Sequence, residues 1–183
     1  EYLTKAYDGE APKIMNYFIE GELPNDGLLI NEFSFEREDG LPSEGWNVGR
    51  YIVGLTDNIS GNIDNYNLMF LPERGENPNH YYFEITPKVI SHIDFEIEGG
   101  ALRYNGASQN EKIRAWYTVK EESFASADII FYYDNQPIEQ CVNAGEYIAK
   151  AIINNANFLL EREQSISFTI AKIAQPTPLV IDH

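Results

Sequence analysis

Apolar and polar residues alternate with a period of two along much of this chain. Within residues 90–98, the side chains of Ile93, Phe95 and Ile97 are apolar, and the residue after each of them is acidic. A β-strand with this pattern has one face against a core and the other face in water. Turn signals rich in Gly, Asn and Asp separate a series of such runs, which predicts an antiparallel all-β protein.

Runs rich in aromatic and β-branched residues give the expected strands. They are residues 13–19, 28–35, 51–55, 68–71 and 80–85 in the first half, and 90–97, 112–120, 128–133, 147–154 and 165–170 in the second. Residues 145–161 contain several alanines and have helix propensity. Their counterpart in the first half, residues 49–55, has strand composition, so we expect strand in both places.

The chain also repeats short motifs in a fixed order. Residues 7–9 (Tyr-Asp-Gly) recur at 104–106 (Tyr-Asn-Gly), residues 47–51 recur at 143–147 (Asn-x-Gly-x-Tyr), and residues 83–88 recur at 168–172. A repeat of this length is the size of a small domain. The sequence therefore predicts two tandem modules, residues 1–89 and 90–183, with residues 174–180 as the truncated lead into a following module.

The repeated motifs have a physical reading as turns. In Tyr-Asx-Gly the glycine can adopt positive φ, and the Asx side chain can bond the backbone two residues further on. Asn-x-Gly-x-Tyr before a strand is similar to the tyrosine corner of immunoglobulin-like sandwiches, in which the phenol bonds an upstream backbone group. We assign that role to Tyr51 and Tyr147. The expected fold is two immunoglobulin-like antiparallel β-sandwich modules, with β-grasp-like modules as the alternative.

Together these motifs resemble the YDG and MBG modules of bacterial surface proteins, which are tandem β-rich repeats of large secreted adhesins. The resemblance also includes Asn-Tyr-x-Leu at residues 65–68, and it departs from the pattern at Asn105, at Phe158 and in the additional residues 72–79. It implies a YDG-like first module and an MBG-like second one. The implied function is a non-enzymatic tandem-repeat segment of an extracellular or cell-surface bacterial protein, acting as a stalk and in adhesion.

Composition narrows the classes of partner. The chain is 43% hydrophobic and 13% aromatic, so it has apolar surface enough to fold. Its 29 acidic and 13 basic residues give a net charge of −16. This balance argues against nucleic acid, whose phosphates need clustered Lys and Arg. It also disfavours anionic membranes, and no apolar run has the length of a membrane span, so we expect no direct membrane insertion by this segment.

The aromatic residues are the candidates for binding. Rings stack on sugar faces, which makes a carbohydrate- or mucin-binding module the alternative function and a host or matrix glycan or protein the expected partner. We single out Trp46, Tyr81 and Trp116, and expect Trp46 to be the most exposed because it precedes a turn. Most of the other aromatic residues are needed to fill two thin cores.

Catalytic and metal signals are weak. The three histidines and the single Cys141 have no counterpart in the other module, and no nucleophile or phosphate-binding motif is present, so we expect no enzyme. The loop at residues 57–65 is rich in Asp and Asn, but its spacing does not fit a calcium-binding loop. We therefore expect no cofactor, with calcium at Asp57 and Asp64 as the alternative.

Overall fold

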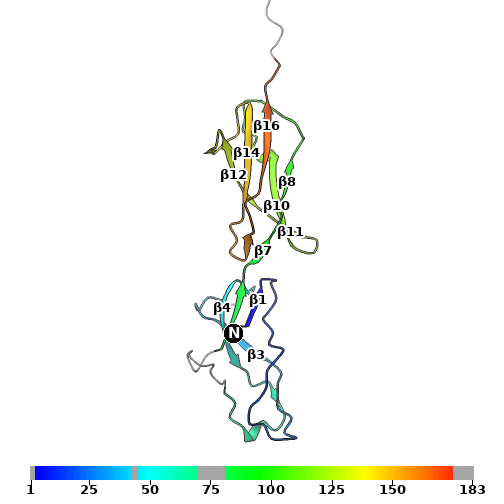
Figure 1. Ribbon diagram of the computed structural model, residues 1–183, viewed down its shortest axis with the longest axis vertical. Helices are drawn as coiled ribbons and strands as arrows, with labels where there is room; N and C mark the ends of the chain where they lie inside the picture. Colours follow the sequence, from blue (N-terminus) through cyan, green and yellow to red (C-terminus); the bar gives the residue numbers. More distant parts are fainter. Residues whose placement is uncertain (1–2, 43–44, 70–80, 175–183) are drawn as a thin grey trace, which may run out of the picture. The chain divides into compact units, whose positions relative to one another are not determined.

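The structure is a computed structural model that describes residues 3–42, 45–69 and 81–174 (Figure 1). In these residues the regular structure is β-strand, with two single-turn 3-10 helices, η1 (Ile63–Asn65) and η2 (Asn110–Lys112), and no α-helix. The all-β class predicted from the period of two is confirmed. The chain divides into two compact units, Glu1–Lys88 and Val89–His183.

Unit 1 is built on one four-stranded sheet with the order β1-β6-β4-β3. Its strands are β1 (Leu3–Ala6), β3 (Phe33–Arg37), β4 (Gly49–Leu55) and β6 (Tyr81–Thr86). The central strand β4 runs antiparallel to both of its neighbours, whereas β1 runs parallel to β6. A second, two-stranded sheet joins β2 (Leu29–Ile30) to β5 (Ile59–Ser60).

The core of unit 1 comes from alternate residues of the two central strands. Tyr51 and Val53 of β4 and Phe83 and Ile85 of β6 are buried, each at most 4% exposed. The residues between them face away from this core, as a period of two requires. Half-buried apolar side chains from β3 and from the connecting segments complete the cluster.

Two strands expected in unit 1 do not appear among the residues that the structure describes. Residues 13–19 form no strand, although Ile14 packs against the core and Met15 points outward, 82% exposed. Here a side chain takes the place of a ladder: the hydroxyl of Tyr17 donates to the carbonyl of Ile30 at 2.9 Å and accepts from its amide at 2.8 Å. In the expected strand at 68–71, residues 68 and 69 are irregular and the others lie outside the described residues, as do residues 72–79.

Unit 2 contains two larger sheets. The five-stranded sheet has the order β13-β12-β14-β16-β9, and the three-stranded sheet has the order β11-β10-β8. Their strands are β8 (Asp94–Ile97), β9 (Leu102–Arg103), β10 (Ile113–Lys120), β11 (Ser123–Ser126), β12 (Asp128–Tyr133), β13 (Gln136–Ile138), β14 (Gly145–Ile152) and β16 (Ser165–Ala171). A two-stranded sheet joins β7 (Lys88–Ile90) to β15 (Phe158–Leu160).

Both larger sheets of unit 2 contribute to one core. Ile113 of β10 lies in the same buried cluster as Phe131, Tyr147 and Phe168, which come from three strands of the five-stranded sheet. Figure 1 shows β12, β14 and β16 as one layer and β8 and β10 as another. This arrangement is consistent with a β-sandwich. The stretch 145–161 is strand in β14 and β15, as expected, and a β-grasp fold is not supported because the described residues contain no α-helix.

The expected strand 90–97 is divided into β7 and β8 by the side chain of Gln164. Its Oε1 accepts from the amide of Ile93 at 2.9 Å, and its Nε2 donates to the carbonyl of Ser91 at 2.8 Å. A single amide side chain thus supplies the donor and the acceptor that a neighbouring strand would otherwise provide. Apolar and polar side chains still alternate along residues 93–97, although the expected strand is interrupted between β7 and β8.

The repeat in the sequence is also a repeat in sheet topology. The order β1-β6-β4-β3 in unit 1 corresponds to β9-β16-β14-β12 in unit 2, with a parallel pair at the same edge of each sheet. Beyond that pair the amide of Tyr7 donates to the carbonyl of Thr86 at 2.8 Å, and that of Tyr104 donates to the carbonyl of Ala171 at 2.9 Å.

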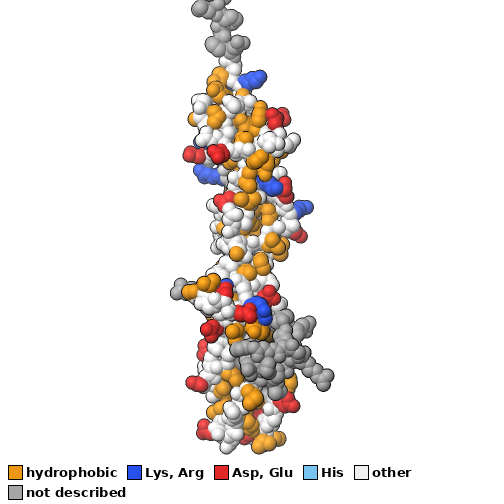
Figure 2. Space-filling model, turned by 90° about the vertical axis from the view of Figure 1, so that its left-hand side faces the viewer, with side chains coloured by type: hydrophobic (Ala, Val, Ile, Leu, Met, Phe, Trp, Pro, Cys, Tyr) orange, Lys and Arg blue, Asp and Glu red, His pale blue; other side chains and the backbone are white. Residues whose placement is uncertain are grey.

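On the face drawn in Figure 2, acidic side chains are spread among hydrophobic and uncharged ones.

Candidate functional site

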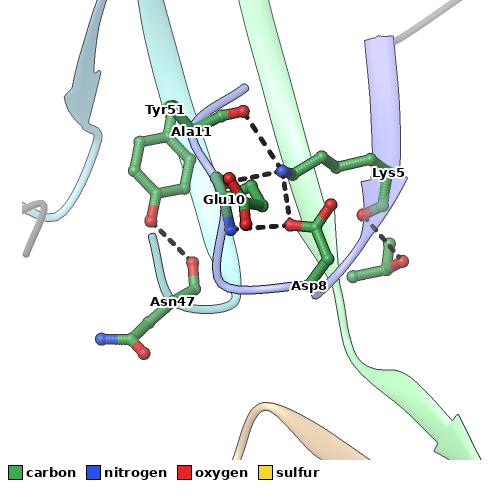
Figure 3. A network of polar contacts seen from close by, with 7 residues as sticks. Lys5, Asp8, Glu10, Ala11, Asn47 and Tyr51 are labelled. Atoms are coloured by element: carbon green, nitrogen blue, oxygen red, sulfur yellow. Dashed lines mark hydrogen bonds and ion pairs between the residues drawn. The ribbon is translucent and has the colours of Figure 1, made fainter. Parts of the chain in front are cut away.

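The Tyr-Asp-Gly motif of unit 1 forms a turn with a charged centre (Figure 3). Oδ1 of Asp8 accepts from the amide of Glu10 at 2.9 Å, and Gly9 has a φ of 76°. Nζ of Lys5 lies 2.7 Å from the same Asp8 oxygen and also donates to the carbonyls of Glu10 and Ala11. Partial burial favours the neutral acid, yet the hydrogen bonds from Lys5 and Glu10 together lower the pKa of Asp8. These contacts hold the turn to β1.

The matching turn in unit 2 uses neutral groups instead. Oδ1 of Asn105 accepts from the amide of Ala107 at 2.9 Å, and Gly106 has a φ of 80°. In place of the lysine, Nε2 of Gln109 donates to Asn105 Oδ1 at 2.6 Å. Gln109 is 5% exposed and is the one buried polar residue among those described. The turn geometry is therefore shared by the two units, and the charge is not.

Both tyrosines assigned to corners make the expected type of bond. The hydroxyl of Tyr51 donates to the carbonyl of Asn47 at 2.6 Å, as Figure 3 shows, and that of Tyr147 donates to Asn143 at 2.7 Å. Burial raises the pKa of Tyr147, since the phenolate would lose its hydration. Each bond fixes the turn that precedes β4 or β14.

A second contact at each corner covers the motif glycine, and the sequence did not reveal it. In unit 1 the guanidinium of Arg37 lies over Gly49 and 5.6 Å from the ring centre of Tyr51. Asp39 pairs with Arg37 through two hydrogen bonds, which lower the pKa of Asp39 to about 2. In unit 2 the ring of Tyr133 lies over the equivalent glycine and 5.1 Å from the ring of Tyr147. No motif marks this position because its residue differs between the units.

Two of the aromatic candidates belong to the core of unit 1. Trp46 is half-buried and packs against the core, although its place before a turn indicated an exposed ring. Its ring contacts Phe35 edge-on at 6.1 Å and tilts against Tyr51 at 5.6 Å. Its backbone has a φ of 46°, in the left-handed region. Tyr81 likewise packs against the buried cluster. Both rings thus serve packing.

The third aromatic candidate, Trp116, lies elsewhere. It is half-buried in β10, between the buried neighbours Ala115 and Tyr117, and so faces away from the core. Across the sheet it is opposite Asp94 of β8 on one side and Ser126 of β11 on the other. Trp46 and Tyr81 thus pack against one cluster in unit 1, and Trp116 belongs to unit 2.

The metal candidates do not form a cluster. Asp57 precedes β5 and Asp64 lies in η1, and the described part of the chain contains no group of three or more His, Cys, Asp or Glu able to hold a metal ion. Several polar groups around this loop bond one another instead: Nδ2 of Asn62 donates to Asp26 at 3.3 Å, and the amide of Asn58 donates to Thr56 Oγ1 at 3.2 Å.

The groups with catalytic potential are equally separate. His92 is exposed and bonds Asp94 at 3.2 Å, whereas Cys141 is fully buried in unit 2, where burial raises the pKa of its thiol to about 11. His80 and His183 lie outside the described residues.

No protein-family model, no curated protein and no solved structure matches this chain. In the residues that the structure describes, no helix has the length and hydropathy to cross a membrane.

Proposed function

We propose that this chain is a non-enzymatic tandem-repeat segment of a bacterial secreted or cell-surface protein, where it acts as a stalk that carries adhesive parts. The features that its two units have in common support this reading. They are turn residues, corner tyrosines and sheet order, all of which serve the scaffold. The histidines and the single cysteine are residues that the units do not share.

One arrangement in the sheet carries the proposal: the first strand of unit 1 lies beside its last and runs parallel to it, with Leu3 opposite Phe83 and Ala6 opposite Thr86. Tension on the chain would pull these two strands in opposite directions along their length. The hydrogen bonds between them would then be loaded together rather than one after another, which suits a part under load. Unit 2 also pairs β9 with β16 in parallel, but β7 and β8 precede β9 there, so the argument from tension applies to unit 1.

Single-molecule stretching of the 183-residue chain by its ends tests this role. Tyr7→Pro deletes the amide that bonds Thr86, whereas Tyr7→Ala keeps the amide and removes only the ring. We expect the force that unfolds unit 1 to fall markedly further in Tyr7→Pro than in Tyr7→Ala. Equal forces in the two variants, or extension of the unmodified chain without a resisting step, would contradict a mechanical role.

The second candidate function is a carbohydrate- or mucin-binding module. A specific observation favours it: the outer face of the three-stranded sheet in unit 2 carries Trp116 and the exposed Phe124. This function is compatible with the first, because a stalk module can also present a binding face.

A further inference from the structure

The sheet β11-β10-β8 presents two aromatic side chains on its outer face. Phe124 of β11 lies opposite Thr118, which is two residues from Trp116 on β10. Residues directly opposite one another share a face of a sheet, and so do residues two apart on one strand. Phe124 and Trp116 are therefore diagonal neighbours, with Cα atoms roughly 7–8 Å apart.

Its exposure sets Phe124 apart from the other described aromatic residues of unit 2, whereas Trp116 is half-buried. Phe124 is 62% exposed, whereas Tyr117 on the opposite face of β10 is 2% exposed and packs edge-on against Phe158 at 5.3 Å. The core is thus filled from the other side of the sheet and does not need Phe124. Contiguous apolar side chains on the outer face of a packed sheet are the kind of feature that marks a binding surface, and Phe124 lies next to Trp116 there.

Polar groups able to bond hydroxyls surround the two rings. Asp94 lies opposite Trp116 on one side, and its carboxylate is 44% exposed. Ser126 lies opposite Trp116 on the other side, and Thr118 follows on the same strand; both are exposed. An apolar platform with a few donors and acceptors at its margin fits a sugar ring, which has an apolar face and hydroxyls around its edge.

The charges on this face select among glycans. Glu98 pairs with Lys112 at 3.4 Å and with Arg114 at 3.1 Å, so these two basic groups already have an acidic partner. Asp94 and Glu96 add negative charge beside Trp116, and the chain as a whole carries −16. Acidic sugars would therefore be repelled, whereas neutral ones would not.

We propose that the outer face of β8, β10 and β11, centred on Trp116 and Phe124, binds neutral pyranose glycans. This inference rests on the second candidate function, names its site and ligand class, and is independent of the stalk role.

Nuclear magnetic resonance of the whole chain provides the test, because its two tryptophans report on different places. The indole N–H of Trp116 lies in the proposed face, and that of Trp46 is packed against the core of unit 1. The probes are the methyl glycosides of glucose, galactose, mannose and N-acetylglucosamine, with sialyllactose as the acidic comparison. We expect at least one neutral glycoside to shift the Trp116 signal in a saturable manner and to leave the Trp46 signal in place, with no shift from sialyllactose.

Two variants locate the site. Phe124→Ala removes an exposed ring and keeps the Trp116 signal; we expect it to raise the dissociation constant about five-fold. The matched control is Tyr132→Ala, on the five-stranded sheet, which should leave the constant unchanged. An unshifted Trp116 signal with every neutral glycoside, or equal affinity in Phe124→Ala and the unmodified chain, would overturn the proposed site. Neither result would alter the stretching experiment, so the stalk role can stand or fall separately.

Discussion

The hydroxyl of Tyr147 donates to the backbone carbonyl of Asn143 at 2.7 Å, four residues before it. Tyr51 makes the same bond to Asn47 in unit 1, at 2.6 Å. The two tyrosines are 3% and 0% exposed, so both bonds are made away from bulk water. Each corner therefore joins a turn to the central strand of its own sheet, β14 or β4.

Tyr147→Phe removes this bond and keeps the ring. We expect the free energy of unfolding of unit 2 to fall by about 1–2 kcal/mol, since the hydrogen bond from the buried Tyr147 to Asn143 is lost. Urea denaturation followed by unit-specific signals measures the change. Tyr51→Phe should have an effect of similar size on unit 1 and none on unit 2. A loss below about 0.3 kcal/mol in both variants would show that the corner bonds contribute nothing to stability.

The ring of Tyr133 leaves no room for a side chain at position 145. A Cβ atom on Gly145 would lie 2.6 Å from Cε2 of that ring, which is far inside van der Waals contact. We expect Gly145→Ala to cost about 1–3 kcal/mol through displacement of Tyr133. Calorimetric or urea unfolding would measure it.

The double variant Gly145→Ala/Tyr133→Ala separates a steric cause from a backbone one. If the ring is the obstacle, the two losses should be less than additive, because the new methyl group enters space that the ring has left. Gly106 is a useful comparison: no atom lies within 4 Å of a Cβ placed there, but its φ of 80° is unfavourable for alanine. Additive losses at 145 and 133 would mean that the contact with Tyr133 is not what requires glycine.

These two positions show what the sequence can predict. Gly145 and Tyr147 recur in both units as part of Asn-x-Gly-x-Tyr, so their importance is visible as a motif. Tyr133 is not, because Arg37 occupies the matching place in unit 1. A cation and a ring can both cover a glycine and pack on a tyrosine, and so the packing is repeated where the residue type is not.

The incorrect expectations have a common physical origin. Residues 13–19 have the aromatic and β-branched composition of a strand, and Trp46 has the sequence position of an exposed turn residue. Composition does not state what bonds the backbone. At Ile30 the hydroxyl of Tyr17 makes those bonds, and Trp46 packs against Phe35 and Tyr51. Both depend on contacts between segments that composition does not encode.

Only one of the two aromatic residues on the outer face of β8, β10 and β11 could be singled out from the sequence. Trp116 could be singled out by residue type, but Phe124 could not, because its exposure depends on the register between β10 and β11. That register shifts between Thr118 and Lys120, so a count along the hairpin would not have given it. Only the structure therefore shows that Trp116 and Phe124 lie next to each other on one face of the sheet.

Cys141 provides a prediction that depends on pH. Its thiol is fully buried, and burial raises its pKa to about 11 from an ordinary value of 9.0. Between these values the unfolded chain releases the thiol proton while the folded chain retains it. The contribution of Cys141 to stability is therefore present below about pH 9 and is lost as the pH rises to about 11.

The measurement is the free energy of unfolding of unit 2 across this alkaline range, for the unmodified chain and for Cys141→Ala. Tyr147 and Tyr117 also have pKa values raised by burial, so both proteins should lose stability at high pH. The alanine variant should start lower, because a buried side chain is truncated, and should lose less between pH 9 and 11. In the folded chain the thiol should also resist alkylation at neutral pH and react once urea unfolds unit 2. Parallel pH profiles for the two proteins, together with rapid alkylation of the folded chain, would mean that the thiol is accessible to water in solution.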